Sequence, residues 1–457
     1  MKNKKLKKAK NIYMIGIKGV GMTPVAQILK EMGKNIFGSD TVEVFFTDKV
    51  LKRHQLKFAE GFNVKNIPEK VDLVIHSSAF SKNNNVEMAE ITRRKIPALT
   101  QAEALAELFN AKQGIAVCGS HGKTTTSALL GFILREAGFK PTVEVGSCVP
   151  QFKGNAITGS GKLMVIEADE YQNKLKLYNP QGVLLNNIDY DHPDYFKTPA
   201  AYQRAFAGFV QRVPKNGFVV ANFDDEKVIQ TVKNCRCKVI SYGSKVSSIK
   251  YQVSNIKGGF QYFNLWQGKK NLGEFKMKLI GEHNVQNATA VIAACLELKA
   301  PVVKIKKALA KFKGTARRME KLGKYKDALF IDDYAHHPTE IKATLKALRQ
   351  EYAKRNIICA FMPHMFSRTK ALLADFARSF GDADEILILP TYSSARENKT
   401  YEISKDLVKK IGNNAKYVSS IKQCADYLKK SVKKNDVIIL MGAGDTFRVW
   451  DKLQVIN

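Results

Sequence analysis

Residues 119–126 read GSHGKTTT, a segment whose residue types could bind a nucleotide triphosphate. An apolar stretch at 114–118 precedes it, and a helical pattern over 125–137 follows it. In such a turn, glycines leave backbone N–H groups free for phosphate oxygens, a lysine neutralises the β- and γ-phosphates, and the next hydroxyl binds Mg²⁺. The usual loop has four residues between its glycines and this one has two, but its context still predicts an ATP site formed by Gly119, Ser120, His121, Gly122, Lys123, Thr124 and Thr125.

Acids and a histidine follow two further predicted strands. The segment EADE, residues 167–170, follows the apolar stretch 163–166, and DYDH, residues 189–192, follows the stretch 183–185. Acids at the carboxyl end of a strand, in the same sheet as a phosphate loop, are placed to hold Mg²⁺. We therefore expect an acid of the first segment to bind one cation and His192 to bind a second, with helix capping as the alternative for either segment.

Three shorter signatures come later in the chain. Asn284 and Asn287 open a predicted helix and share one face of it, where amide groups could bind an adenine edge or simply cap the helix. The segments 332–338, DDYAHHP, and 363–369, PHMFSRT, each lie between a predicted strand and a predicted helix. Charged and aromatic groups after several strands indicate a cleft between domains, although a proline turn would explain His337 and a helix-surface charge would explain Arg368.

A second glycine cluster lies near the N-terminus. Gly16, Gly19 and Gly21 follow the apolar stretch 12–17, in an order reversed from the dinucleotide-binding pattern. Asp40 ends the next predicted strand, where a ribose-binding acid would lie, and Ser77 follows the strand predicted at 71–75. Binding of a dinucleotide or a nucleotide sugar is one explanation of this cluster, and a plain tight turn is the other.

The elements that position these groups alternate between strand and helix along the whole chain. This pattern predicts an α/β protein with parallel sheets, and the length of 457 residues predicts two or three domains. We divide the chain into residues 1–112, 113–313 and 314–457. A stretch near 238–280 is β-rich, so the sheet of the middle segment is predicted to be mixed.

Composition narrows the classes of function. The net charge of +32 suggests nucleic acid, but the lysines are spread along the chain without an arginine–aromatic alternation, so we expect no nucleic-acid partner. No run of 18 apolar residues occurs, and we expect no membrane partner and a solvated basic tail at the N-terminus. The seven scattered cysteines are typical of a reduced, cytoplasmic protein.

Taken in order, the segments GSHGKTTT, EADE, NNIDYDH, EHNVQN, ARRME, DDYAHHPTE and PHMFSRT resemble those of the Mur ligases, the ATP-dependent amino-acid ligases of peptidoglycan precursor synthesis. The shortened phosphate loop is typical of that family. The resemblance, closest to the alanine-adding branch, implies an N-terminal Rossmann-like domain that binds a UDP-sugar, a central P-loop ATPase-type domain and a C-terminal Rossmann-like domain that binds the amino acid. It implies a monomer or weakly associated homodimer that joins L-alanine to the carboxylate of UDP-N-acetylmuramate through an acyl phosphate.

The resemblance also implies roles for particular residues. Lys123 and Thr124 would engage ATP and Mg²⁺, while Glu167 and His192 would hold a second Mg²⁺. The adenine, ribose and phosphate contacts would come from Asn284, Asn287, Arg318 and Asp333. The UDP-sugar would be bound by Gly16, Gly19, Gly21, Asp40 and Ser77. The amino-acid pocket would contain Tyr334, His336, His364 and Arg368, with Arg368 on the carboxylate and His336 as the base.

Four departures from the family pattern leave the substrate open. Met365 stands where many alanine-adding members have arginine, Gly61-Phe62 replaces a Gly-His pair, and the residues after EADE differ. The absence of lysine between Lys197 and Lys215, where sister ligases carry a carbamylated lysine, favours the alanine-adding branch. The alternatives are a recycling ligase that attaches a murein tripeptide, a nucleic-acid-stimulated ATPase and an NAD-dependent dehydrogenase.

Overall fold

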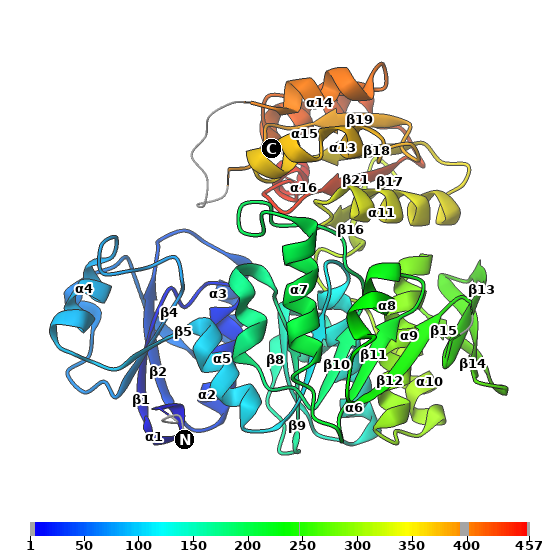
Figure 1. Ribbon diagram of the computed structural model, residues 1–457. Coiled ribbons are helices and arrows are strands. Elements are labelled where there is room, and N and C mark those ends of the chain that lie inside the picture. The colour runs from blue at the N-terminus through cyan, green and yellow to red at the C-terminus, as the bar shows by residue number, and fades with distance from the viewer. Residues whose placement is uncertain (1–4, 246, 394–401, 455–457) are drawn as a thin grey trace.

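The computed structural model describes residues 5–245, 247–393 and 402–454, which form three α/β units, each built on one sheet (Figure 1). The first unit, in blue, lies beside the second, and the third, in yellow to red, lies above them. This architecture confirms the predicted α/β class and the mixed central sheet. The proposed boundaries at 112/113 and 313/314 fall between the sheets and stay predictions.

The N-terminal unit is a parallel sheet with the strand order β3-β2-β1-β4-β5. Its strands are β1 (Asn11–Ile15), β2 (Asn35–Asp40), β3 (Lys57–Glu60), β4 (Leu73–His76) and β5 (Ala98–Thr100), and its helices are α1 (Lys5–Lys8), α2 (Met22–Glu31), α3 (Phe46–Arg53), α4 (Val86–Arg93) and α5 (Gln101–Asn110). The N-terminal glycine cluster, Gly16, Gly19 and Gly21, follows the central strand, β1. The expectation of a solvated tail is wrong for residues 5–8, because Leu6 packs into the core and the segment forms a helical turn.

The central unit is a ten-stranded sheet with the order β15-β14-β13-β12-β11-β10-β6-β9-β7-β8. Its strands are β6 (Gln113–Cys118), β7 (Thr142–Val149), β8 (Gly154–Ile157), β9 (Leu163–Glu167), β10 (Gly182–Leu185), β11 (Phe218–Asn222), β12 (Lys238–Gly243), β13 (Ile249–Lys257), β14 (Phe260–Gln267) and β15 (Lys270–Met277). Its helices are α6 (Lys123–Ala137), α7 (Pro199–Val210), α8 (Glu226–Val232), α9 (Glu282–Glu297) and α10 (Val302–Lys311).

Three neighbouring parallel strands at the centre of this sheet position the candidate site. Strand β6 pairs with β10 on one side and with β9 on the other, and Cys118 lies level with Leu185 while Val117 lies level with Glu167. These strands are apolar and almost fully buried, as expected for a parallel sheet covered on both faces. Their carboxyl ends therefore deliver the phosphate loop and both acidic segments to one edge.

The C-terminal unit is a six-stranded sheet with the order β16-β17-β21-β18-β19-β20, parallel except for β16. Its strands are β16 (Glu320–Tyr325), β17 (Ala328–Asp333), β18 (Ile357–Phe361), β19 (Glu385–Ile388), β20 (Ala415–Tyr417) and β21 (Val437–Met441). Its helices are α11 (Pro338–Glu351), α12 (Phe366–Ala371), α13 (Leu373–Ala377), α14 (Ser404–Ile411), α15 (Ile421–Ser431) and α16 (Arg448–Gln454). Strands β17 and β18 flank β21, so the two segments that follow them emerge close together.

The structure also bears on the expectations for the cysteines and for membrane-spanning helices. All seven cysteines are free. None of the helices in the described part of the chain has the length and hydrophobicity of a membrane-spanning segment.

Candidate active site

The phosphate loop follows β6 and is packed against the exit of β10. Gly119 and Gly122 both have a positive φ, of 128° and 77°. A Cβ on Gly122 would lie 2.5 Å from Asn287 Oδ1, and one on Gly119 would lie 2.9 Å from the Asn187 carbonyl oxygen. The loop therefore requires glycine for both its backbone conformation and its close packing. Helix α6 starts directly after it, at Lys123.

Lys123 points back into the loop. Its Nζ donates to the carbonyl oxygens of Gly119 (2.6 Å) and Ser120 (3.0 Å) and to Glu170 Oε2 (3.0 Å). Burial alone would lower the pKa of this ammonium, but the negative charges of Glu170, Asp169 and Glu167 raise it above its usual value. Lys123 is therefore charged at the position where a phosphate loop requires a cation.

The acids and His192 form two neighbouring groups. Thr124 Oγ1 donates to Glu167 Oε1 (2.8 Å), at the start of α6. His192 Nε2 lies 3.4 Å from Glu170 Oε1, and the ligand atoms of Asp169, Glu170 and His192 lie within 4.8 Å of one another. The structure thus joins Thr124 to Glu167 and joins His192 to Glu170. The expected shared role of Glu167 and His192 stays a prediction.

Glu170 is the functional candidate that the sequence reasoning did not single out from EADE. It is almost fully buried, and Tyr202 also donates to it (3.0 Å). Burial opposes ionisation, but the charge of Lys123 and the contact with His192 lower the pKa of Glu170 to about 2. Spacing alone does not distinguish it from Asp169, because which acid points inward depends on the irregular backbone after β9.

A cavity of about 600 Å³ opens between the central and C-terminal units. It gathers residues from the phosphate loop, from the start of α9 and from the segment around β17. The predicted nucleotide-binding residues among its lining are His121, Gly122, Thr125, Asn284, Asn287, Arg318 and Asp333. A volume of this size is within the usual range of small-molecule sites. His283 also lines it, and burial lowers the pKa of that histidine to about 4.

Asp333 lies at the C-terminal side of this cavity. Its two carboxylate oxygens accept hydrogen bonds from the backbone N–H groups of Met319 and Ala335, both at 2.8 Å. Burial raises the pKa of Asp333 above its usual value. Next to it, the guanidinium groups of Arg317 and Arg318 lie over the Tyr334 ring at 5.1 and 5.0 Å.

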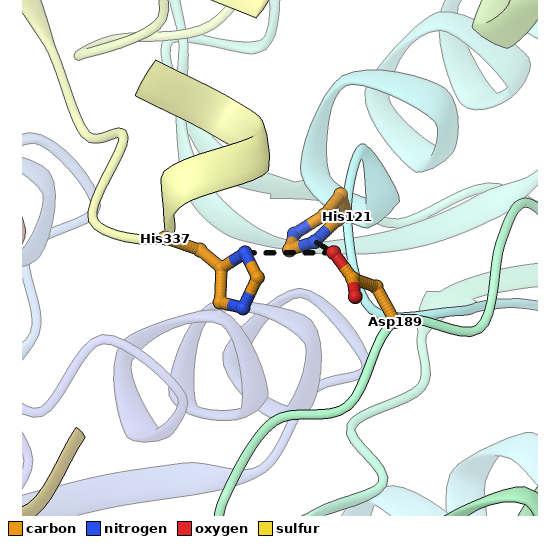
Figure 2. A group of neighbouring side chains, drawn as sticks. All are labelled: His121, Asp189 and His337. Carbon is orange, nitrogen blue, oxygen red and sulfur yellow. Dashed lines mark hydrogen bonds and ion pairs between the residues drawn. The ribbon is translucent and has the colours of Figure 1, made fainter. Parts of the chain in front are cut away.

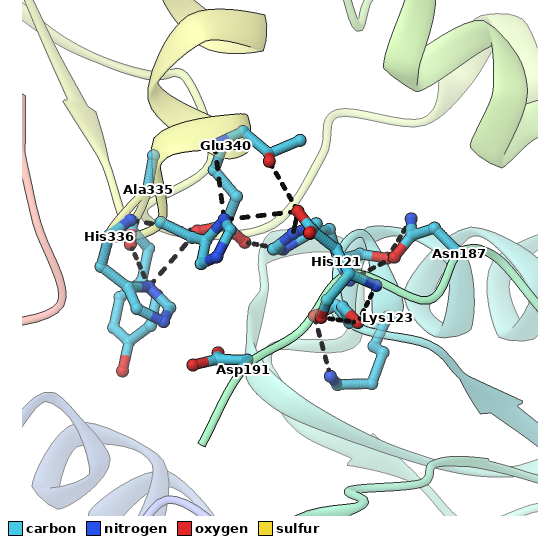
Figure 3. A network of polar contacts seen from close by, with 12 residues as sticks. His121, Lys123, Asn187, Asp191, Ala335, His336 and Glu340 are labelled. Atoms are coloured by element: carbon cyan, nitrogen blue, oxygen red, sulfur yellow. Dashed lines mark hydrogen bonds and ion pairs between the residues drawn. The ribbon is translucent and has the colours of Figure 1, made fainter. Parts of the chain in front are cut away.

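His121 of the phosphate loop connects the two units (Figure 3). Its Nε2 lies 3.0 Å from Asp189 Oδ2, and its Nδ1 lies 3.2 Å from Glu340 Oε1 on helix α11. Burial alone would lower the pKa of His121, but hydrogen bonds to these two carboxylates raise it to about 9. At neutral pH an imidazolium therefore bridges the phosphate loop to the C-terminal unit, a contact that the sequence did not predict.

The predicted amino-acid pocket is assembled from two segments. The His336 ring lies 5.3 Å from the Tyr334 ring and 6.1 Å from the His364 ring. His336 Nδ1 lies 3.0 Å from the Tyr334 carbonyl oxygen, and burial lowers the pKa of His336 to about 4. With Nδ1–H donating to that carbonyl, Nε2 of the neutral ring is left as a proton acceptor.

Arg368 belongs to the same group but already has a carboxylate partner. Its Nε and Nη2 donate to the two oxygens of Asp191, at 2.9 and 3.2 Å, and its Nη1 lies 3.4 Å from His364 Nδ1. Both members of the ion pair are buried. Met365 lies at the start of α12 with a φ of 72° and is also buried. Any acid that binds Arg368 must therefore compete with Asp191.

The N-terminal glycine cluster forms a separate polar group. A Cβ on Gly16, which has a φ of 84°, would lie 2.7 Å from the Phe80 ring. Asp40 accepts from the backbone N–H groups of Lys18 (2.6 Å) and Thr41 (2.8 Å), so it closes the turn. The UDP-sugar contacts predicted for Gly16, Gly19, Gly21, Asp40 and Ser77 stay predictions.

Lys18, inside the glycine cluster, was not expected to have a role. It is almost fully buried, and its Nζ donates to the carbonyl oxygens of Thr41 (3.0 Å) and Glu43 (2.9 Å) and pairs with Asp48 (3.1 Å). It therefore fixes the 41–48 segment against the glycine turn. In the sequence, the only feature that could have indicated a structural role for Lys18 is its position between Gly16 and Gly19.

Comparisons with known proteins agree with this arrangement. Family models match residues 11–113 (Mur ligase family, catalytic domain), 117–295 (Mur ligase middle domain) and 317–444 (Mur ligase, glutamate ligase domain). The chain is 39% identical over 453 residues to a UDP-N-acetylmuramate–L-alanine ligase of Desulfitobacterium hafniense, covering 97% of this chain and 99% of that protein. It is 38% identical over 437 residues to the enzyme of the same name from Aquifex aeolicus, covering 95% of each.

Solved structures show the same architecture. The UDP-N-acetylmuramate–alanine ligase of Thermotoga maritima superposes with a TM-score of 0.82 at 25% identity, over 97% of this chain and 99% of that one. A murein peptide ligase of Psychrobacter arcticus superposes with a TM-score of 0.75 at 23% identity, over 98% and 99% of the two chains. The second likeness shows a shared fold alone.

Proposed function

The chain belongs to the Mur ligase family, and we propose that it is an ATP-dependent ligase that joins L-alanine to the carboxylate of UDP-N-acetylmuramate in peptidoglycan precursor synthesis. The observation that carries the proposal is the 39% identity to a ligase of that name over nearly the full length of both chains. The cavity shared by the phosphate loop and the C-terminal unit supports the use of ATP. The proposal includes a cytoplasmic location. The oligomeric state stays a prediction.

The first chemical step is the activation of the muramoyl carboxylate. A carboxylate is a poor acyl donor because oxide is a very poor leaving group, and transfer of the γ-phosphoryl group of ATP turns it into an acyl phosphate. The incoming carboxylate and the γ-phosphate repel each other. Lys123 is a charged donor within the phosphate loop, and preorganised cations of this kind stabilise the transition state of phosphoryl transfer.

Mg²⁺ fits the oxygen-rich part of the site. Thr124 Oγ1 and Glu167 Oε1, which are 2.8 Å apart, would hold one ion, and His192 with Glu170 would hold a second. This grouping differs from the single ion that the family resemblance implies for Glu167 and His192. Bound Mg²⁺ supplies positive charge that offsets the repulsion between the two anionic substrates. Among the residues of this part of the site, Glu170 is held in its ionised form, so it can serve as a ligand without first losing a proton.

The second step is attack by the amine of alanine on the acyl carbon. We assign the removal of the amine proton to His336, whose ring is neutral at physiological pH and whose Nε2 is free to accept a proton. Arg368 would bind the alanine carboxylate when its pair with Asp191 opens. The tetrahedral oxyanion then collapses, releasing phosphate and forming the amide.

Contacts between the central and C-terminal units would keep water from the acyl phosphate. Asp189 accepts from Thr339 Oγ1 (2.6 Å), and Asp191 pairs with Arg368, so the loop after β10 touches two segments of the C-terminal unit. Closure of this kind protects a reactive intermediate from hydrolysis.

The test is phosphate release from ATP in the presence of UDP-N-acetylmuramate, with alanine, glycine, serine or the murein tripeptide added one at a time. We expect release that depends on both the nucleotide sugar and free alanine. Met365 stands where many alanine-adding ligases have an arginine that could bind the carboxylate of free alanine. The murein tripeptide has no free carboxylate on its alanine, because that group is already part of an amide, so it is the alternative substrate to compare with free alanine. Release with the tripeptide alone would replace alanine ligation by peptide recycling.

A further inference from the structure

Two histidines and an aspartate from three segments meet beside the phosphate loop (Figure 2). They are His121 of that loop, Asp189 of the loop after β10 and His337 at the start of helix α11. We propose that these three side chains form a binding site for a transition-metal ion of the Zn²⁺ type, at the junction of the central and C-terminal units. This site is distinct from the oxygen-rich groups assigned to Mg²⁺.

The spacing of the ligand atoms is close to that of a tetrahedral site. Asp189 Oδ2 lies 3.0 Å from His121 Nε2 and 3.5 Å from His337 Nδ1. Ligands about 2.0–2.1 Å from a tetrahedral ion are separated from each other by about 3.3 Å. The three atoms all lie within 4.8 Å of one another, so the third edge closes with a small movement of the two imidazoles.

The groups around the three ligands are those that metal sites use to orient them. The other ring nitrogen of His121, Nδ1, contacts the carboxylate of Glu340 at 3.2 Å, which fixes the orientation of that ring. The Asp189 oxygen also accepts from Thr339 Oγ1 (2.6 Å), and its other lone pair faces His121 Nε2, so an ion that binds both atoms displaces the Nε2 proton of His121 to solvent. A carboxylate on the far side of a ligating histidine and a hydrogen bond to a ligating carboxylate are common features of such sites.

His337 supplies independent support, because its ring is poorly satisfied by the protein alone. Its Nδ1 has one lone pair, which accepts only a long bond from the Thr339 backbone N–H (3.4 Å), and it lies 3.5 Å from the Asp189 oxygen, which is itself an acceptor. A bound ion would replace that long bond at Nδ1. His337 Nε2 has no hydrogen-bond partner among the described residues, although the side chain is 95% buried. A cation between the imidazole and the carboxylate would turn a contact between two acceptors into two coordinate bonds.

The ligand types select the class of ion. Two imidazole nitrogens and one carboxylate oxygen suit Zn²⁺ and similar ions, whereas Mg²⁺ favours groups in which oxygen ligands predominate, such as Asp169 and Glu170 beside His192. Three protein ligands leave a fourth position open. Because the ligands come from both units, and His121 and Asp189 line the nucleotide cavity, a bound ion would fix α11 against the phosphate loop and slow nucleotide exchange.

The test measures Zn²⁺ binding directly, on the full, tag-free chain, stripped with EDTA and free of nucleotide, by isothermal titration calorimetry. The informative variant is His337→Asn, because asparagine preserves the helix cap while removing the imidazole. We expect one tight Zn²⁺ per wild-type chain. Loss of an outer partner alone weakens metal sites about 10–100-fold, so loss of this ligand is expected to weaken binding more than about 100-fold.

Two matched controls locate the ion. His336→Gln changes the neighbouring histidine, which faces Tyr334 and Glu340, and should leave Zn²⁺ affinity within a few-fold of wild type. His192→Gln removes the histidine of the other candidate cluster and should do the same. Co²⁺ in the wild-type protein is expected to give the strong visible absorption of a tetrahedral complex.

The opposite results would overturn the proposal. These are the absence of binding at micromolar Zn²⁺, equal affinity in wild type and His337→Asn, or loss of binding in His192→Gln instead. Because the titration contains no ligase substrate, failure here leaves the proposed ligase activity untouched, and failure of the ligase assay leaves this site untouched.

Discussion

Replacement of His121 by glutamine should remove a pH-dependent contribution to the stability of the junction between the central and C-terminal units. The protonated ring lies between Asp189 and Glu340, and it is 12% exposed. Its pKa is about 9 in the folded chain, against an ordinary value of 6.5. A group whose pKa is raised by folding contributes stability that is fully present below pH 6.5 and is lost as the pH rises through 9.

The magnitude follows from the size of this shift. A pKa difference of 9 minus 6.5 corresponds to about 3 kcal/mol of unfolding free energy. For a chain of 457 residues, the entropy of unfolding is about 1 kcal/mol/K, so this loss corresponds to a melting temperature lower by about 3 °C. Asp189 and Glu340, the acids beside His121, do not contribute to the pH dependence of stability between pH 6.5 and 9, because their pKa values lie well below this range.

Differential scanning calorimetry between pH 6 and 9.5 measures the effect, with EDTA present to exclude metal binding. His121→Gln removes the positive charge between the two carboxylates and should be less stable than wild type at low pH. The difference in melting temperature between the two proteins should shrink as the pH rises from 6.5 to 9. Parallel profiles, or a difference that grows with pH, would refute the assignment of a charged His121.

Three further predictions concern the ligase reaction. Lys123→Met should lower kcat by about 10²–10³-fold, the usual cost of removing one preorganised group from a developing charge, and unchanged ligation would exclude its phosphate role. Gly122→Ala should raise the KM for ATP about tenfold. The left-handed φ at this position and a Cβ placed 2.5 Å from Asn287 Oδ1 together cost roughly 1–3 kcal/mol. An unchanged KM would mean that the loop has room to adjust. Arg368→Lys should raise the KM for alanine about tenfold and leave the KM for ATP unchanged, because lysine keeps the positive charge but cannot form two parallel hydrogen bonds to a carboxylate. Equal increases in the two KM values would point to a purely structural role for Arg368.

Much of the fold could be predicted from local sequence. The strand before GSHGKTTT and the helix after it are recognisable because an apolar run, a glycine turn and a helical pattern succeed each other without interruption. The buried strand β9 coincides with the apolar stretch 163–166 to within one residue, since it is a short apolar run. The short strands β5, β8 and β20 were missed, because three or four residues carry too little periodicity.

The sequence by itself therefore determined the types of chemical group and the strand ends that carry them, because a parallel sheet brings its carboxyl ends to one edge. Only the tertiary structure decided which groups meet across the units. Glu340 on His121 and Asp191 on Arg368 join residues that are 219 and 177 positions apart. No local pattern encodes such contacts, because the direction of a side chain after a strand and the packing of one unit on another depend on the whole folded chain.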